Sequence, residues 1–343
     1  MKPQLPRITS SRSPCSAEAA SVQCPAAPGP ESGPLSRTNI DLPDELSGLS
    51  LTAARLFAQT PAAPPAPVAA FRDLRRGVGV FTASGGAIGW LVNDAGAMAI
   101  DSQYANTAPL AVAGLKERSP KGIELLLNTH HHADHTGGNQ VFRSVVRRIV
   151  AHENCLLWHK KTAAASNSEA QTSFADTTFK DTWKTAFGDE TVQARYYGPG
   201  HTSGDAVYHF EKANVVHMGD LLFNRAHPNI DRPAGARIDN WISALDKVAK
   251  AHTADTIYIA GHGKDNGVSC TKADVQHFRD YLTACLDTAR KAVKAGQSKD
   301  DIQKTTSLPG FEDFAMLNAR LSQGFVLGVC YEEITGQGLG ARG

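Results

Sequence analysis

The sequence predicts an α/β fold, and three observations support this prediction. From Phe71 onward, short apolar runs that read as strands alternate with longer stretches that read as helices. This texture occurs twice along the chain, which fits an α+β sandwich built from two similar halves. Histidines and aspartates follow the predicted strand ends, where α/β sheets place their ligands.

The first half supplies four predicted strands and one helix before a histidine-rich segment. Ser84-Gly85-Gly86 forms the turn between the first two strands, and Gly137-Gly138 permits a tight turn into a short helix near Asn139 to Arg143. The predicted strands are Gly77 to Thr82, Ala87 to Val92, Ala97 to Ile100 and Ile123 to Leu127, with a helix at Thr107 to Arg118.

The second half repeats this order and then becomes helical. The predicted strands are Val192 to Tyr197, a hairpin of Asp205 to Phe210 with Asn214 to His217, and Thr256 to Ala260, with a helix at Ile238 to His252. Further helices are expected at Lys272 to Ala295 and at roughly Phe311 to Tyr331, so that residues 263–343 form a largely helical tail. The predicted domain therefore covers residues 69–343.

Residues 1–68 have a different composition, because twelve of the eighteen prolines fall in the first 67 residues. A segment rich in Pro, Ser and Ala with few aromatic residues buries too little apolar surface to offset its ordering entropy, which predicts a disordered leader. Leu46 to Ala58 resembles the end of a secretory signal. Either the true start lies inside the chain, which favours a periplasmic or secreted protein over a cytoplasmic one, or this segment is a linker.

The overall composition excludes several classes of protein. The 343 residues are 41% hydrophobic and 20% charged, enough for one large core or two small ones. A net charge of +1 and a pI of about 7.7 give no sign of nucleic acid binding. No apolar run reaches the roughly 18 residues of a membrane span. The six cysteines form no C-x-x-C pair, so we expect mostly buried or free thiols.

One segment carries an unusual density of metal-ligating residues. It reads His130-x-His132-x-Asp134-His135, and the chain later presents His201, Asp220 and His262, each beside a glycine. Imidazole nitrogen and carboxylate oxygen are ligands of zinc and its borderline neighbours. No helix or strand needs that much histidine in order to pack, so the segment predicts a functional site rather than a structural role.

These motifs, in this order, resemble the metallo-β-lactamase fold superfamily over roughly Phe71 to His262. Asp101, at the end of a predicted strand, is an additional member of the pattern. The resemblance implies a four-layer αβ/βα sandwich with metals at one edge of two packed sheets. It leaves the substrate open, because the superfamily includes lactamases, thioesterases, lactonases, nucleases and oxygen-using iron enzymes.

The resemblance also implies a role for each ligand. A first metal would be held by His130, His132 and His201, a second by Asp134, His135 and His262, and Asp220 would bridge the two. Asp134 would in addition take the proton of the attacking water, and Asp101 would order the metal loops from behind. The expected cofactors are two Zn²⁺ ions per chain, and the carboxylate bridge also tolerates iron or manganese. In an extended loop His130 and His132 point the same way, while His131 points elsewhere.

The sequence departs from the resistance lactamases at the bridging position. Those enzymes carry cysteine there and lysine three residues later, whereas this chain has Asp220 and Phe223. Asn224 or Arg225 could replace the lysine as a substrate contact. The predicted function is hydrolysis of a small ester, thioester, lactone or β-lactam-like amide by a metal-bound hydroxide. The alternatives are a glyoxalase II-like thioesterase, a mononuclear iron enzyme resembling persulfide dioxygenases, and a metal-binding protein without catalysis. The oligomeric state stays open.

Overall fold

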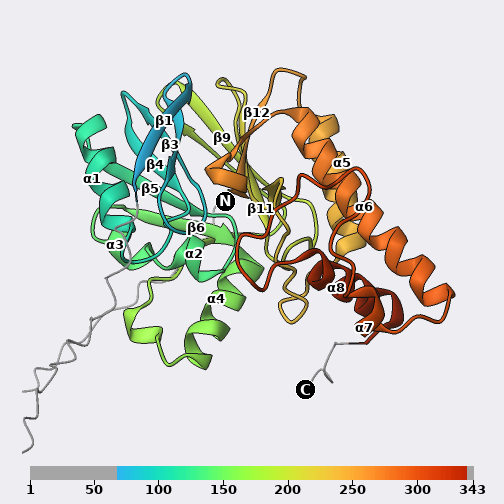
Figure 1. The fold of residues 1–343 in the computed structure, drawn as a ribbon. Coiled ribbons are helices and arrows are strands. Elements are labelled where there is room, and N and C mark those ends of the chain that lie inside the picture. The colour runs from blue at the N-terminus through green and yellow to red at the C-terminus, as the bar shows by residue number, and fades with distance from the viewer. Residues whose placement is uncertain (1–67, 338–343) are drawn as a thin grey trace, which may run out of the picture. The chain divides into compact units, whose positions relative to one another are not determined.

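The computed structural model describes residues 68–337. The predicted leader, its signal-like segment at Leu46 to Ala58, Cys15 and Cys24 lie outside the described residues. The first strand begins at Ala70. From there the chain forms two mixed β-sheets with helices packed against them (Figure 1).

The first sheet has seven strands in chain order, and the second has six in the order β13-β12-β11-β10-β9-β8. The first sheet contains β1 (Ala70–Arg75), β2 (Val78–Thr82), β3 (Ile88–Asn93), β4 (Gly96–Ile100), β5 (Ile123–Asn128), β6 (Arg148–His152) and β7 (Thr177–Phe179). The second contains β8 (Thr182–Phe187), β9 (Glu190–Tyr196), β10 (Ala206–Phe210), β11 (Val215–Asn224), β12 (Ile257–Gly263) and β13 (Ser269–Cys270).

Eight α-helices lie within the described range, together with two 3₁₀ turns at Glu169–Gln171 and Lys264–Asn266. The helices are α1 (Ala108–Arg118), α2 (Ala133–Thr136), α3 (Asn139–Arg143), α4 (Glu153–Ala165), α5 (Ile238–Ala251), α6 (Lys272–Lys294), α7 (Lys299–Ile302) and α8 (Gln323–Thr335).

Three apolar clusters show how the layers pack. Met98 and Leu127 of the first sheet share a cluster with Tyr208 and Ile259 of the second, so the two sheets meet face to face. The outer face of the first sheet packs on α1 and α3, and that of the second sheet packs on α5, α6 and α8. This arrangement confirms the predicted four-layer αβ/βα sandwich.

Parallel pairing of the strands places the candidate metal ligands at one edge of the sheets. Strands β4 to β7 pair parallel to one another in the first sheet, and β11 pairs parallel to β12 in the second. The carboxyl ends of parallel strands lie at the same edge of a sheet, so the segments that follow β4, β5 and β6 lie close together.

Three local expectations were wrong. The histidine-rich segment is not all loop, because Ala133–Thr136 forms one helical turn that carries Asp134 and His135. Asp220 does not follow its strand, because β11 continues to Asn224 and contains it. The helix expected over Phe311 to Tyr331 begins only at Gln323, where the Ser322 side chain accepts a hydrogen bond from the Phe325 backbone N–H.

The chain before Ser322 is irregular because contacts with another part of the fold override its helical pattern. Ala315 N–H donates to the Arg225 carbonyl at 3.0 Å, and His227 N–H donates to the Ala315 carbonyl at 3.0 Å. These bonds use backbone groups that a helix would need for itself. They tie the tail to the segment that follows β11.

Two further expectations concern the membrane and the thiols. Within residues 68–337 we find no helix long and apolar enough to cross a membrane. The four cysteines in this range are buried free thiols, as predicted: Cys155, Cys270, Cys285 and Cys330.

Candidate metal centre

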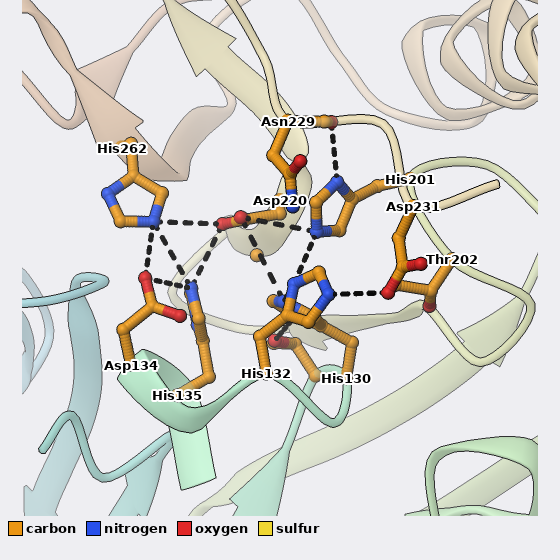
Figure 2. A network of polar contacts seen from close by, with 12 residues as sticks. His130, His132, Asp134, His135, His201, Thr202, Asp220, Asn229, Asp231 and His262 are labelled. Carbon is orange, nitrogen blue, oxygen red and sulfur yellow. Dashed lines mark hydrogen bonds and ion pairs between the residues drawn. The ribbon is translucent and has the colours of Figure 1, made fainter. Parts of the chain in front are cut away.

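The structure brings all seven predicted metal ligands together at one edge of the two sheets (Figure 2). They form two sets of donors with Asp220 between them. We call His130, His132 and His201 the three-histidine group, and Asp134, His135 and His262 the mixed group.

The nitrogens of the three-histidine group converge on one point. His132 Nδ1 lies 3.1 Å from His130 Nε2 and 2.9 Å from His201 Nε2. His130 and His132 come from the loop after β5, and His201 comes from the loop after β9. His130 and His201 are completely buried.

In each ring of the three-histidine group, the hydrogen-bond partner of the nitrogen that faces away from the shared point identifies the tautomer. Thr129 Oγ1 donates to Asp101 Oδ2, so it accepts a hydrogen bond from His130 Nδ1 at 3.0 Å. His201 Nδ1 donates to the Asn229 carbonyl at 2.9 Å. His132 Nε2 donates to Asp231 Oδ2 at 2.8 Å. Each ring therefore keeps its proton on the outer nitrogen and directs a lone pair at the shared point, as the ligands of a cation must.

The mixed group lies beside this point. His262 Nε2 is 3.0 Å from Asp134 Oδ2 and 3.3 Å from His135 Nε2. Asp134 and His135 come from α2, and His262 comes from β12. His262 stacks on the ring of Phe223, with centroids 5.5 Å apart and an interplanar angle of 22°.

Asp220 spans the two groups (Figure 2). Its Oδ2 lies 3.4 Å from His201 Nε2, and its Oδ1 lies 3.1 Å from His135 Nε2 and 3.5 Å from His262 Nε2. Asp220 Oδ1 is buried and has no well-directed hydrogen bond. A buried carboxylate oxygen without a donor is costly, and a metal cation would satisfy it. The residues present therefore fit metal binding.

The electrostatics of the site agree with metal binding. Burial lowers the pKa of His130 well below its usual value and lowers that of His201 to about 4, so both rings are neutral at pH 7. Burial is the largest single effect and raises the pKa of Asp220, but the neighbouring histidines, His262 and His135 first, together outweigh it and hold this pKa far below the ordinary value. Burial also lowers the pKa of His135 and His262, but the carboxylates beside them, Asp220 first, raise it above the usual value, so these two rings would release a proton when they bind a metal.

Asp101 supports the site from behind and is completely buried. Its Oδ1 accepts from the Thr129 N–H at 2.7 Å, and its Oδ2 accepts from Thr129 Oγ1 at 2.7 Å and from His135 Nδ1 at 2.8 Å. One carboxylate thus fixes the start of the histidine loop and the orientation of His135. This is the placement that the resemblance implied for Asp101.

Two glycines make room for Asp220. Gly219 has a φ of +51°, where β11 shifts register against β12, and a Cβ there would lie 2.6 Å from the Thr129 side chain. A Cβ on Gly261 would overlap Asp220 Oδ1. The bulge in β11 turns Asp220 towards the histidines, which explains how a residue inside a strand reaches the site.

A cavity of about 570 Å³ opens onto the metal ligands. His132, Asp134, Asp220 and His262 line it on one side, and the segment from Leu317 to Phe325 lines it on another. Of the two carboxylates, Asp134 is the more open, with 22% of its side chain exposed against 4% for Asp220.

Asn224 and Arg225 are placed away from this cavity. Arg225 pairs with Asp274 at 2.7 Å and with Asp313 at 2.8 Å, and Asn224 donates to the Gly267 carbonyl at 2.6 Å. Their hydrogen-bonding groups serve the attachment of the C-terminal segment. Neither residue is among those that line the cavity, and their expected role as substrate contacts stays a prediction.

Sequence reasoning missed three supports of the histidines: Thr129, Asn229 and Asp231. Thr129 stands directly before the motif, and its hydroxyl was a readable signal. Asn229 and Asp231 lie far along the chain in an irregular loop, and no periodic pattern marks them. His131 belongs to neither donor group; it is buried, and its Nε2 lies 3.6 Å from Asp231 Oδ2, the oxygen that also contacts His132.

Comparison with known proteins agrees with this geometry. The family profile described as the metallo-beta-lactamase superfamily matches residues 83–262. The chain is 25% identical over 170 residues to a metallo-beta-lactamase type 2 of Bacillus sp. (strain 170), which covers 49% of this chain and 63% of that protein. It is 30% identical over 141 residues to a hydroxyacylglutathione hydrolase of Rhodospirillum rubrum, over 41% of this chain and 48% of that protein. The chain thus matches less than two thirds of either relative's length.

Solved structures show the same fold. A metallo-beta-lactamase from Pontibacter korlensis superposes with a TM-score of 0.53 at 19% identity, over 63% of this chain and 99% of that one. At this identity the likeness concerns the fold alone.

Proposed function

This chain belongs to the metallo-beta-lactamase superfamily of metal-dependent hydrolases, and on that premise we propose that it is a binuclear zinc enzyme. Its substrate would be a small ester, thioester, lactone or amide. The single observation that carries the proposal is the position of Asp220, whose two oxygens face two separate groups of donors. A mononuclear site would not need the second group.

The donor atoms fit zinc. Five imidazole nitrogens and two carboxylates surround the two points, and both kinds of donor are zinc ligands. Ligands that a tetrahedral zinc holds at 2.0–2.1 Å lie about 3.3 Å apart, close to the 2.9–3.1 Å between the nitrogens of the three-histidine group. When bound, two such metals would lower the pKa of a shared water towards about 7 and polarise the substrate carbonyl.

The chain's own residues would divide the remaining work. Asp220 is buried and acts as a fixed anion that holds the spacing of the two groups. Asp134 opens to the cavity, and we assign to its carboxylate the proton that the attacking water releases. Phe223 and Tyr104 line the same cavity and limit the water around the substrate.

The relatives indicate two substrate classes, lactams and thioesters. Dedicated lactam hydrolysis is disfavoured here, because the position three residues after Asp220 is the buried Phe223 rather than a lysine that could bind a lactam carboxylate. The chain also resembles hydroxyacylglutathione hydrolases, whose name indicates a thioester substrate, and nothing at Asp220 or Phe223 argues against a thioester. We therefore place thioesters and esters before lactams.

The proposal is tested by elemental analysis together with a panel of chromogenic esters, thioesters, lactones and lactams. We expect about two zinc ions per chain after reconstitution, and turnover of at least one ester or thioester. His252→Ala, which removes a histidine from the end of α5, serves as the control for His201→Ala and His262→Ala. Protein that binds no metal when supplied with zinc, iron and manganese would refute the proposal. A single iron per chain with oxygen-dependent turnover of a persulfide would establish the mononuclear alternative instead.

A further inference from the structure

Two of the three outer partners of the three-histidine group come from one irregular segment. We call residues 229–237 the outer loop; it lies between β11 and α5. The Asn229 carbonyl accepts from His201 Nδ1 at 2.9 Å, and Asp231 Oδ2 accepts from His132 Nε2 at 2.8 Å (Figure 2). The outer loop therefore sets the orientation of two metal ligands.

The outer loop is held by backbone hydrogen bonds and by one buried ion pair. Asp231 N–H donates to the His201 carbonyl at 3.2 Å, and Ala236 N–H donates to the Asp231 carbonyl at 2.9 Å. Next to Asp231, Arg232 is buried, and its Nη1 donates to Oε2 of Glu333 in α8 at 2.9 Å. Within residues 68–337 this is the one ion pair that Arg232 makes, so Glu333 balances its buried charge.

Glu333 also caps the helix that follows the outer loop. Its Oε2 accepts from the Ile238 N–H at 3.0 Å, and its Oε1 accepts from the Asp239 N–H at 3.1 Å. These are the first N–H groups of α5, and Arg237 at the N-cap position makes no side-chain capping hydrogen bond. The positive end of the helix dipole favours a carboxylate at this place. One side chain of α8 therefore holds the outer loop both at Arg232 and where the loop enters α5.

The helix that carries Glu333 lies outside the part of the chain that the family profile matches. The match ends at residue 262, and α8, in dark red in Figure 1, begins at Gln323. The helix packs into the core through Val326, Leu327 and Cys330, so it presents the Glu333 carboxylate from a rigid element. A continuous path of contacts therefore leads from α8 to the metal ligands, from Glu333 through the outer loop.

From these contacts we propose that Glu333 is a positioning residue of the metal centre, and that it sets the metal affinity of the three-histidine group through Arg232 and Asp231. The C-terminal helix thereby takes part in metal binding without supplying a ligand. This inference rests on the metal-dependent function proposed above. Glu333 belongs to neither donor group, so its effect reaches the metal only through the orientation of the His132 and His201 rings.

The test follows zinc release from the full chain in a His262→Ala background, in which the three-histidine group is the one group that keeps all its donors. Glu333→Gln keeps the size of the side chain and removes the charge that faces Arg232 and two backbone N–H groups. In graded dialysis against a chelator, zinc should leave this variant at about tenfold lower chelator concentration than its parent. Glu332→Gln is the matched control, because it breaks an ion pair of the same helix, with Lys299, and should release zinc as its parent does.

Two further variants test the path and guard against misfolding. If Glu333 acts through Asp231, Glu333→Gln should weaken zinc binding much less when Asp231→Asn is already present. Glu333→Asp keeps the charge and shortens the reach by one methylene, so its zinc release should lie between those of the parent and of Glu333→Gln. If Glu333→Gln does not fold, Glu333→Asp takes its place in the comparison.

The outcomes separate this inference from the function on which it rests. If the Glu333 variants lower the melting temperature of the metal-free protein and leave zinc release unchanged, Glu333 supports the fold alone and the inference is overturned. Equal shifts in Glu333→Gln and Glu332→Gln would assign the effect to loosening of α8 in general, and fully additive effects of Glu333→Gln and Asp231→Asn would overturn the path through Asp231. A wild-type chain that binds no zinc would instead refute the proposed function itself.

Discussion

The three-histidine group and the mixed group differ in how firmly the protein fixes their donor atoms. Each ring of the three-histidine group has its outer nitrogen held, by Thr129, Asp231 or Asn229. In the mixed group only His135 is held in this way, by Asp101. Asp134 and His262 are 22% and 19% exposed, and no described residue holds the Nδ1 of His262 by a hydrogen bond.

This difference predicts that the two groups bind their metals with different affinities. Hydrogen bonds from outer partners fix the orientation of a ligand and raise metal affinity, so the three-histidine group should hold its metal more tightly. The mixed group gives up some of that fixation. Both groups reach the cavity, the three-histidine group through His132 and the mixed group through Asp134 and His262. We expect the metal of the mixed group to exchange faster.

The largest effect should follow from Asp220→Asn, because Asp220 serves both groups. The amide keeps the size and removes the charge between two cations. We expect the metal content to fall from about two to about one, and turnover to fall about a thousandfold. Asp220→Cys should keep zinc and disfavour iron and manganese, since thiolate is a soft ligand. An Asp220→Asn protein that retains two metals and full turnover would show that Asp220 is not a ligand.

The second test addresses the comparison itself. Graded dialysis against a chelator should remove metal from wild type in two steps. His262→Ala should eliminate the weaker step and leave the tighter one, whereas His201→Ala should eliminate the tighter step. Metal content at each chelator concentration is the measurement. Loss of both metals in one step from wild type would contradict the difference in affinity that we infer from the outer hydrogen bonds.

The sequence alone predicted the layers of the fold and the seven residues that lie together as candidate metal ligands. Apolar runs such as β5 and motifs such as His130-x-His132 are local, so short-range periodicity reveals them. The order of the motifs then supplied the pairing of distant ligands, which periodicity alone could not have given.

The remaining features depend on contacts between distant segments. The segment before α8 is irregular because the Ala315 backbone forms hydrogen bonds with Arg225 and His227, and no local sequence pattern predicts these hydrogen bonds. Arg225 stands next to the site in sequence, yet Asp274 and Asp313 hold it elsewhere. The bulge that turns Asp220 inward was marked only by Gly219, one glycine among 30.

A smaller effect is expected from Asp231→Asn, which weakens the outer hydrogen bond of His132. Loss of such a partner costs about 10- to 100-fold in metal affinity. We expect the tighter chelator step to shift by this factor while the weaker step stays in place. Asp300→Asn, in the exposed first turn of α7, is the matched control and should shift neither. A shift of the weaker step alone would show that the two groups have been assigned the wrong way round.

The smallest shift in metal affinity should come from Phe223→Leu. This variant gives the most specific test of how the two donor groups differ. Since no hydrogen bond holds His262 Nδ1, its ring is oriented by stacking on Phe223, whereas His201 contacts the same ring but is also held by Asn229. Aromatic pairs contribute about 0.5–1.5 kcal/mol, so the weaker chelator step should shift about threefold to tenfold and the tighter step should not. Phe278→Leu, in the same core 6.0 Å from Phe223, should lower the free energy of unfolding similarly without moving either step. Equal shifts in both variants would mean that core packing in general, and not the stacked ring, positions His262.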